Sequence, residues 1–124
     1  MKKRLVVAAA VASLATAVAV PLAVAAPQHT TTSSVYINAV KNGLAYNKKT
    51  LHANAGTVAV VFTNLSHLKH NVRFEIGEKE YGGTKTIGHG TTKVTLTLAK
   101  GKYHYYCSVP GHEDAGMSGY LYVK

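Results

Sequence analysis

Residues 92–98 read Thr-Lys-Val-Thr-Leu-Thr-Leu, and this stretch decides the fold class. Val94, Leu96 and Leu98 occupy every second position, with Lys93 and threonines between them. Successive side chains of a β-strand point to opposite faces of the sheet, so this alternation predicts a strand with one apolar and one polar face. The stretch therefore predicts a sheet that covers a core on one side and contacts water on the other.

Short runs of β-branched and aromatic residues recur on both sides of this stretch, separated by turns that contain Gly or Asn. This pattern is typical of an all-β domain. Strands are predicted at residues 35–40, 57–63, 71–76, 93–98, 102–107 and 120–123, with a weaker one at 50–53 and a brief edge strand at 85–87 within a long loop at 81–92. The run at 57–63 is almost continuously apolar, which predicts a central strand. Six or seven strands predict a two-sheet Greek-key β-sandwich over residues 35–124.

The segment before this domain predicts export. Basic residues at positions 2–4 precede an apolar stretch at 5–26, and small residues at 23–25 match the site that signal peptidases cut. We therefore expect a signal peptide at residues 1–25, cleaved after Ala25, followed by a short flexible lead at 26–34. An uncleaved membrane anchor is the alternative, because the apolar stretch is just long enough to span a bilayer.

Composition limits the classes of protein that the chain can be. It has 124 residues, with 14 Lys and Arg against 5 Asp and Glu, 7 His and one Cys. That size allows one small domain, without a separate cofactor domain. A single Cys excludes an intramolecular disulfide, a Cys₄ zinc site and an iron–sulfur cluster. The positive charge predicts solubility, or encounter with acidic proteins or an anionic membrane face. Nucleic acid is not an expected partner, because the basic residues are scattered singly.

The one cysteine lies in a loop that combines three metal-binding side chains. Cys107, His112 and Met117 follow one another at five-residue intervals, between an aromatic strand and the last predicted strand. Thiolate and thioether groups select copper, and two His with one Cys and a weak axial Met is the ligand set of a blue-copper centre. Each residue alone would be unremarkable, so the spacing carries the prediction. His70, which opens the predicted strand at 71–76, is the best candidate for the second His.

In these residues the chain resembles the cupredoxins, the blue-copper proteins that include plastocyanin, azurin and rusticyanin. The resemblance extends over essentially the whole of residues 35–124, and the ligand-loop spacing is closest to that of rusticyanin. It implies one type 1 copper ion with His70, Cys107 and His112 as equatorial ligands and Met117 as the axial ligand. It also implies that the Asn71 backbone donates to the Cys sulfur and that its side chain ties the two ligand loops together. An ordinary turn Asn is the alternative reading of Asn71.

The other histidines are not expected to bind copper. His67 is an alternative to His70, but it fits the start of the strand less well. His104 is out of phase with Cys107, so the two side chains should point to opposite faces of the strand. The remaining histidines lie in the flexible lead or beside turns and are expected at the surface: His29, His52 and His89.

The resemblance implies a monomeric one-electron carrier that has no small-molecule substrate. Redox proteins would dock near His112, against a patch for which the loop offers four apolar residues: Val109, Pro110, Ala115 and Met117. Peripheral association with a membrane is also compatible with the charge. Related copper enzymes carry His beside the copper Cys, whereas Tyr106 and Ser108 flank Cys107, so no enzymatic activity is expected. The alternatives are a periplasmic copper-binding or storage protein, and a copper-free domain with an inert buried Cys.

Overall fold

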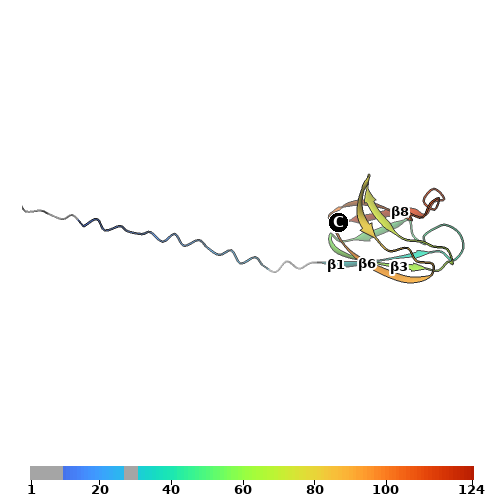
Figure 1. The fold of residues 1–124 in the computed structure, drawn as a ribbon, viewed down its shortest axis with the longest axis horizontal. Coiled ribbons are helices and arrows are strands. Elements are labelled where there is room, and N and C mark those ends of the chain that lie inside the picture. Colours follow the sequence, from blue (N-terminus) through green and yellow to red (C-terminus); the bar gives the residue numbers. More distant parts are fainter. Residues whose placement is uncertain (1–9, 27–30) are drawn as a thin grey trace, which may run out of the picture.

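The computed structural model describes residues 10–26 and 31–124, and Figure 1 shows a β-sandwich preceded by a long extended segment. Residues 10–26 are exposed and have no regular secondary structure. Within the described ranges, no helix is long and apolar enough to cross a membrane. The basic start of the predicted signal peptide, and residues 27–30 of the predicted lead, lie outside the described residues. Cleavage after Ala25 therefore stays a prediction.

The part of the chain that the structure describes has eight strands and no helix, which confirms the all-β prediction. The strands are β1 (Thr32–Ala39), β2 (Thr50–Ala53), β3 (Gly56–Asn64), β4 (Arg73–Ile76), β5 (Lys79–Gly83), β6 (Gly90–Leu98), β7 (Gly101–Tyr106) and β8 (Ser118–Val123).

The strands form two sheets, as predicted. One sheet has the order β1-β3-β6 and the other the order β2-β8-β7-β4-β5. β1 pairs in parallel with β3, and β2 in parallel with β8, whereas the other neighbouring strands are antiparallel. Parallel neighbours cannot be joined by a tight hairpin. β2 follows β1 and precedes β3 in the chain but lies in the other sheet, so the connections on both sides of β2 cross between the sheets.

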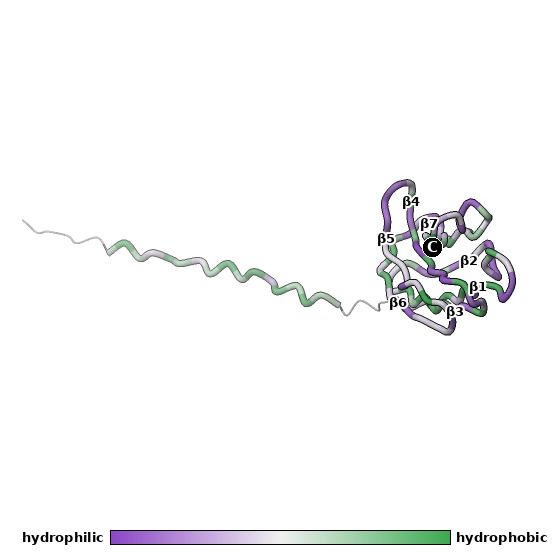
Figure 2. Tube along the Cα trace, turned by 45° about the vertical axis from the view of Figure 1, so that its right-hand side comes forward, coloured by the Kyte–Doolittle hydropathy of each residue, from purple (hydrophilic) through white to green (hydrophobic). Residues whose placement is uncertain are grey.

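The core lies between the sheets, and the alternating strands fill it. β6 turns Leu98 inward, and β3 lies between β1 and β6, as its apolar run predicts. The inner side chains of β3 are completely buried: Val58, Val60 and Phe62. Figure 2 shows that much of the remaining apolar sequence lies in the extended segment at residues 10–26.

Two predicted boundaries are wrong. The strand expected at 85–87 is β5, at Lys79–Gly83, and Ile87 makes only an isolated bridge with His70. β5 is a half-exposed edge strand that follows a turn at Gly77 (φ +59°). Because it buries little side-chain surface, its sequence lacks the apolar alternation that predicts a strand. β1 begins at Thr32, inside the predicted flexible lead, because its backbone already pairs with β3 from that residue. Both elements depend on backbone pairing more than on side-chain pattern.

Candidate metal centre

The loop between β3 and β4 holds the first histidine. Asn64, the last residue of β3, is completely buried, and its side-chain amide donates to the carbonyls of Leu68 (2.7 Å) and Ile87 (2.8 Å). The backbone of His70 exchanges two hydrogen bonds with that of Ile87, at 3.0 and 2.9 Å. These bonds fix the backbone of His70, whose side chain is completely buried.

The loop from Cys107 to Met117 closes on itself. The N–H of Cys107 donates to the carbonyl of Met117, and the N–H of Met117 donates to the carbonyl of His112, both at 3.1 Å. Gly111 and Gly116 adopt φ angles of +83° and +103°, which other residues rarely reach. The loop therefore needs both glycines to keep this shape.

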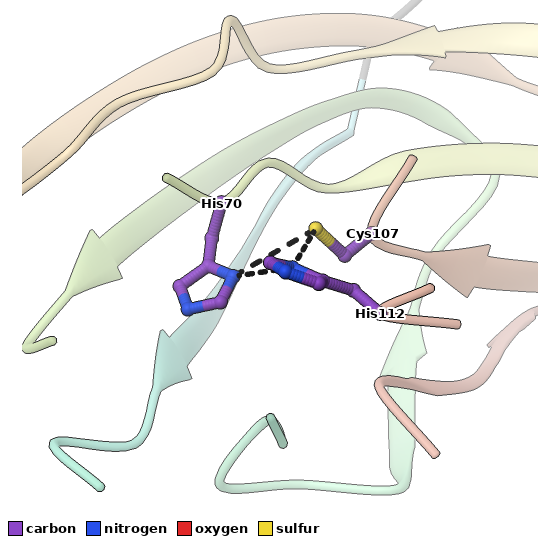
Figure 3. Close-up of side chains that lie close together, drawn as sticks. All are labelled: His70, Cys107 and His112. Atoms are coloured by element: carbon purple, nitrogen blue, oxygen red, sulfur yellow. Dashed lines mark hydrogen bonds between the residues drawn. The ribbon is translucent and has the colours of Figure 1, made fainter. Parts of the chain in front are cut away.

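Three side chains from these two loops converge in Figure 3: His70, Cys107 and His112. The Cys107 sulfur lies 3.8 Å from Nδ1 of His70 and 3.5 Å from Nδ1 of His112, and the two Nδ1 atoms are 3.1 Å apart. Ligand atoms of one tetrahedral ion, with bonds of about 2.0–2.3 Å, lie about 3.3–3.6 Å from one another. The three observed separations lie within about 0.2 Å of the range that ligands of a single metal ion adopt.

The electrostatics of this group also favour a metal. Burial lowers the pKa of His70 from its usual range, and the neighbouring His112 lowers it further. The imidazole of His70 is therefore neutral near pH 7 and keeps a lone pair for a metal. Cys107 is buried and His112 is half-buried. One sulfur and two imidazole nitrogens, closed off on one side and reaching solvent on the other, fit copper.

Met117 is completely buried at the end of the same loop. Its backbone is bonded to both Cys107 and His112, so it is placed beside two of the three converging residues. The same burial corrects one expectation, because a fully buried Met117 cannot belong to a surface docking patch. Of the other residues expected there, Pro110 and Ala115 are exposed and Val109 is half-buried.

Asn71 joins the two loops through its side chain. Its Oδ1 accepts a hydrogen bond from the N–H of Ser108 at 2.9 Å, and its Nδ2 donates to the Ser108 hydroxyl at 2.7 Å and to the Thr86 hydroxyl at 2.9 Å. In the described part of the chain, no hydrogen bond runs from the Asn71 backbone to the Cys107 sulfur, so that part of the expectation stays a prediction. The side-chain bonds tie the residue after His70 to the residue after Cys107.

Tyr46 is a supporting residue that sequence reasoning missed. Its buried hydroxyl donates to the backbone carbonyl of Asn71, and its ring packs edge-on against Phe62 with centroids 6.3 Å apart. Burial raises the pKa of Tyr46 far above its usual range, so the phenol stays protonated and remains a donor. Its sequence neighbours, a turn-like run of Gly, Asn and Lys, give no sign of this role.

The other described histidines lie away from this group. His67 is exposed, and its ring stacks on that of His89 with centroids 5.5 Å apart. His104 faces outward from β7, and its Nδ1 lies 3.0 Å from a carboxylate oxygen of Glu75. His52 is exposed on β2. His29 lies outside the described residues.

A β-sandwich with a Cys, two His and a buried Met between its loops defines a cupredoxin. Residues 33–124 match the model of the copper-binding proteins of the plastocyanin/azurin family. The chain therefore belongs to the plastocyanin/azurin family. Copper is its cofactor, and it is a copper-binding electron-transfer protein.

Solved structures of blue-copper proteins are similar to the whole domain. Auracyanin from Roseiflexus castenholzii is 26% identical over 74% of this chain and 97% of that one, with a TM-score of 0.70. Auracyanin A from Chloroflexus aurantiacus, a "blue" copper protein, is 25% identical over 76% and 100%, with a TM-score of 0.68. Rusticyanin from Thiobacillus ferrooxidans is 26% identical over 75% and 77%, with a TM-score of 0.65. No curated protein sequence matches the chain.

Proposed function

We propose that the chain is a small, soluble blue-copper carrier that passes single electrons between redox proteins. His70, Cys107 and His112 are the equatorial ligands of one copper ion, and Met117 is its axial ligand. The observation that carries this proposal is the convergence of the Cys107 sulfur and the two Nδ1 atoms within 3.8 Å. Bound copper supplies one-electron chemistry, because it alternates between Cu(I) and Cu(II).

The surrounding residues hold the ligands in one arrangement. A carrier works best when its ligands keep nearly the same geometry in both oxidation states, which a stiff scaffold provides. Asn64 fixes the backbone that presents His70, and Asn71 fixes Ser108, the residue after Cys107. The bond between Ser108 and Asn71 joins the two ligand loops, which are far apart in the chain, so it resists their relative movement.

His112 is the route to a partner. His70 and Cys107 are closed off from solvent, whereas His112 is half-buried and stands beside the exposed Pro110 and Ala115. A redox protein that docks over these residues would bring its own centre close to the His112 ring. The net charge is +9 for the whole chain and +6 (11 Lys and Arg against 5 Asp and Glu) once the basic residues at 2–4 leave with the signal peptide. This positive charge favours an acidic partner surface, and it would also favour peripheral contact with an anionic membrane.

The protein is proposed to transform no substrate. In related copper enzymes a His beside the copper Cys leads to a second copper centre, and here Tyr106 and Ser108 occupy those positions. It is proposed to work as a monomer outside the cytoplasm after export and cleavage behind Ala25. The mass and N-terminal sequence of the protein recovered from the producing cells test the cleavage. An intact N-terminus would favour the membrane-anchor alternative.

Copper loading tests the proposal. Adding Cu(II) to the metal-free protein should give an intense visible absorption band that disappears and returns on reduction and reoxidation. Cys107→Ser should abolish the band. Met117→Leu should keep copper bound but raise the reduction potential, because leucine removes a donor that stabilises Cu(II).

His67→Ala is the matched control for His70→Ala. Both remove an imidazole from the same loop, but His67 is exposed and lies outside the converging group. The blue band should survive His67→Ala and be lost in His70→Ala. Weak, colourless copper binding by the unaltered protein would instead favour a storage role and would overturn the carrier.

A further inference from the structure

We propose that the chain carries a second metal site, for a divalent transition-metal ion of the Zn²⁺ type, formed by Glu75, His104 and Glu113. Glu75 lies on β4 and His104 on β7, while Glu113 follows the ligand His112 in the loop between β7 and β8. Each residue offers one ligand atom, and the three atoms lie within 4.8 Å of one another. This group lies outside the set of residues that converges on Cys107.

The sheet register and the loop bring the three side chains together. Glu75 is paired directly with His104 across the antiparallel β4–β7 ladder. Nδ1 of His104 lies 3.0 Å from the Glu75 carboxylate and 4.0 Å from that of Glu113. Ligands of a tetrahedral ion lie about 3.3 Å apart, so the Glu113 carboxylate needs to approach Nδ1 of His104 by less than about 1 Å. Its side chain is 47% exposed and has room for that adjustment.

Aromatic rings fix the imidazole that completes the group. The ring of His104 stacks on Tyr106 at 5.6 Å with an interplanar angle of 12°, and contacts Tyr120 at 5.3 Å. His104 is therefore held with Nδ1 directed at both carboxylates before any ion arrives. A ligand that is already oriented loses less conformational freedom on binding.

The charges around the group favour a cation. Two carboxylates face one imidazole, and the two cations nearby have other partners. Arg73 pairs with Glu80, and the ammonium of Lys102 lies 4.2 Å from the centre of the Tyr120 ring. A divalent ion would balance both glutamates at once. One imidazole nitrogen with carboxylate oxygens suits Zn²⁺, whereas Mg²⁺ prefers oxygen ligands and water.

An ion bound here would join two strands of the sheet to the copper-ligand loop. Glu113 is the residue directly after His112. Occupancy would therefore restrain the backbone next to the copper ligand that reaches the surface. The competing arrangement keeps the 3.0 Å contact between His104 and Glu75 and binds no ion.

Calorimetric titration of the copper-loaded protein with Zn²⁺ tests the site, because copper already occupies the Cys107 group. We expect one Zn²⁺ per molecule, with a dissociation constant little changed by excess Mg²⁺. His104→Phe keeps the ring stacking and should weaken Zn²⁺ binding at least tenfold. Glu113→Gln replaces an exposed side chain, so it should leave the fold intact and also weaken Zn²⁺ binding. His52→Phe is the matched control, since His52 is an exposed imidazole stacked on Tyr122 in the same sheet.

Three results would overturn the proposal. The first is Zn²⁺ affinity in His104→Phe and Glu113→Gln within twofold of the unaltered protein. The second is an equal loss in His52→Phe, which would indicate nonspecific binding to surface imidazoles. The third is competition by Mg²⁺ at similar concentration, which would exclude His104 as a ligand. A retained blue band in each variant would show that the fold and the copper centre are intact.

Discussion

Replacing Asn71 with Ala removes three hydrogen bonds without removing a charge. The lost bonds are those from the Ser108 N–H, to the Ser108 hydroxyl and to the Thr86 hydroxyl, at 2.9, 2.7 and 2.9 Å. Alanine keeps the backbone carbonyl, so the bond donated by Tyr46 can persist. The substitution therefore isolates the side-chain connection between the two ligand loops.

The structure sets the size of the effect. Each intramolecular hydrogen bond contributes about 0.5–1.5 kcal/mol net, so three bonds correspond to about 1.5–4.5 kcal/mol. Asn71 is only 4% exposed, so water replaces the lost partners poorly. In a domain of this size, 1 kcal/mol moves Tm by about 4–8 °C. We therefore expect Asn71→Ala to lower Tm by at least about 6 °C.

Thermal unfolding of the metal-free protein, followed by circular dichroism, measures this effect without a contribution from copper. Asn47→Ala is the matched control. Asn47 is exposed and its side chain accepts one hydrogen bond, from the N–H of Asn38 at 2.8 Å, so its loss should cost less than about 1.5 kcal/mol. In the copper-loaded protein, Asn71→Ala should also release copper faster to a competing chelator than Asn47→Ala does.

A double-mutant cycle separates the Ser108 contact from the rest. Ser108→Ala removes the hydroxyl but leaves the N–H that donates to Asn71. The double variant should be less destabilised than the sum of the two single variants, with a coupling of about 0.5–1.5 kcal/mol. Additive effects, or equal Tm losses in Asn71→Ala and Asn47→Ala, would refute the idea that Asn71 connects the loops.

Three further outcomes are expected. Gly119→Ala should destabilise the domain by about 2–4 kcal/mol, because a Cβ there would overlap the Tyr105 hydroxyl. At Gly88 a Cβ would meet nothing within 4 Å, so Gly88→Ala should change the free energy of unfolding by less than about 1 kcal/mol. Equal urea midpoints for the two variants would contradict this. Tyr46→Phe should cost about 1–2 kcal/mol in the same assay, and an unchanged midpoint would show that the buried hydroxyl contributes nothing. The metal-free protein should lose stability as pH falls below about 6.5, because burial lowers the pKa of His70 in the folded state and the unfolded chain then binds more protons. A His70→Gln variant should lose less stability over this pH range. Parallel stability–pH profiles for the two proteins would contradict the role given to His70.

The parts of the fold that could be predicted are those in which side chains alternate. β6 and β3 carry apolar residues on the face that meets the core, so their sequences reveal them. β5 and the first residues of β1 carry polar or small residues, and backbone bonds to a neighbouring strand hold them in place. Backbone hydrogen bonds do not depend on residue type, so the amino-acid sequence does not indicate them.

The candidate site divides in the same way. Cys107, His112 and Met117 lie in one loop, so their spacing alone predicted that they act together. His70 is the best candidate for the second His because it opens a predicted strand, and its role as an equatorial ligand comes from the family resemblance. No local spacing relates it to a loop more than thirty residues later. Thr86 and Tyr46 are ordinary residue types in distant segments. Their contacts with Asn71 could be known only from the folded chain.

The position of β8 has a consequence for the order in which the molecule is assembled. β8 is the last strand in sequence but an interior strand of its sheet, between β2 and β7. Its partner β2 is synthesised about seventy residues earlier and cannot form this pairing until β8 has been synthesised. Pairing between strands so far apart in sequence is slow. The loop that bears Cys107 and His112 is anchored at one end by β8. A chain still in synthesis or export therefore has no finished metal site, and copper capture becomes a sign that the last strand has docked.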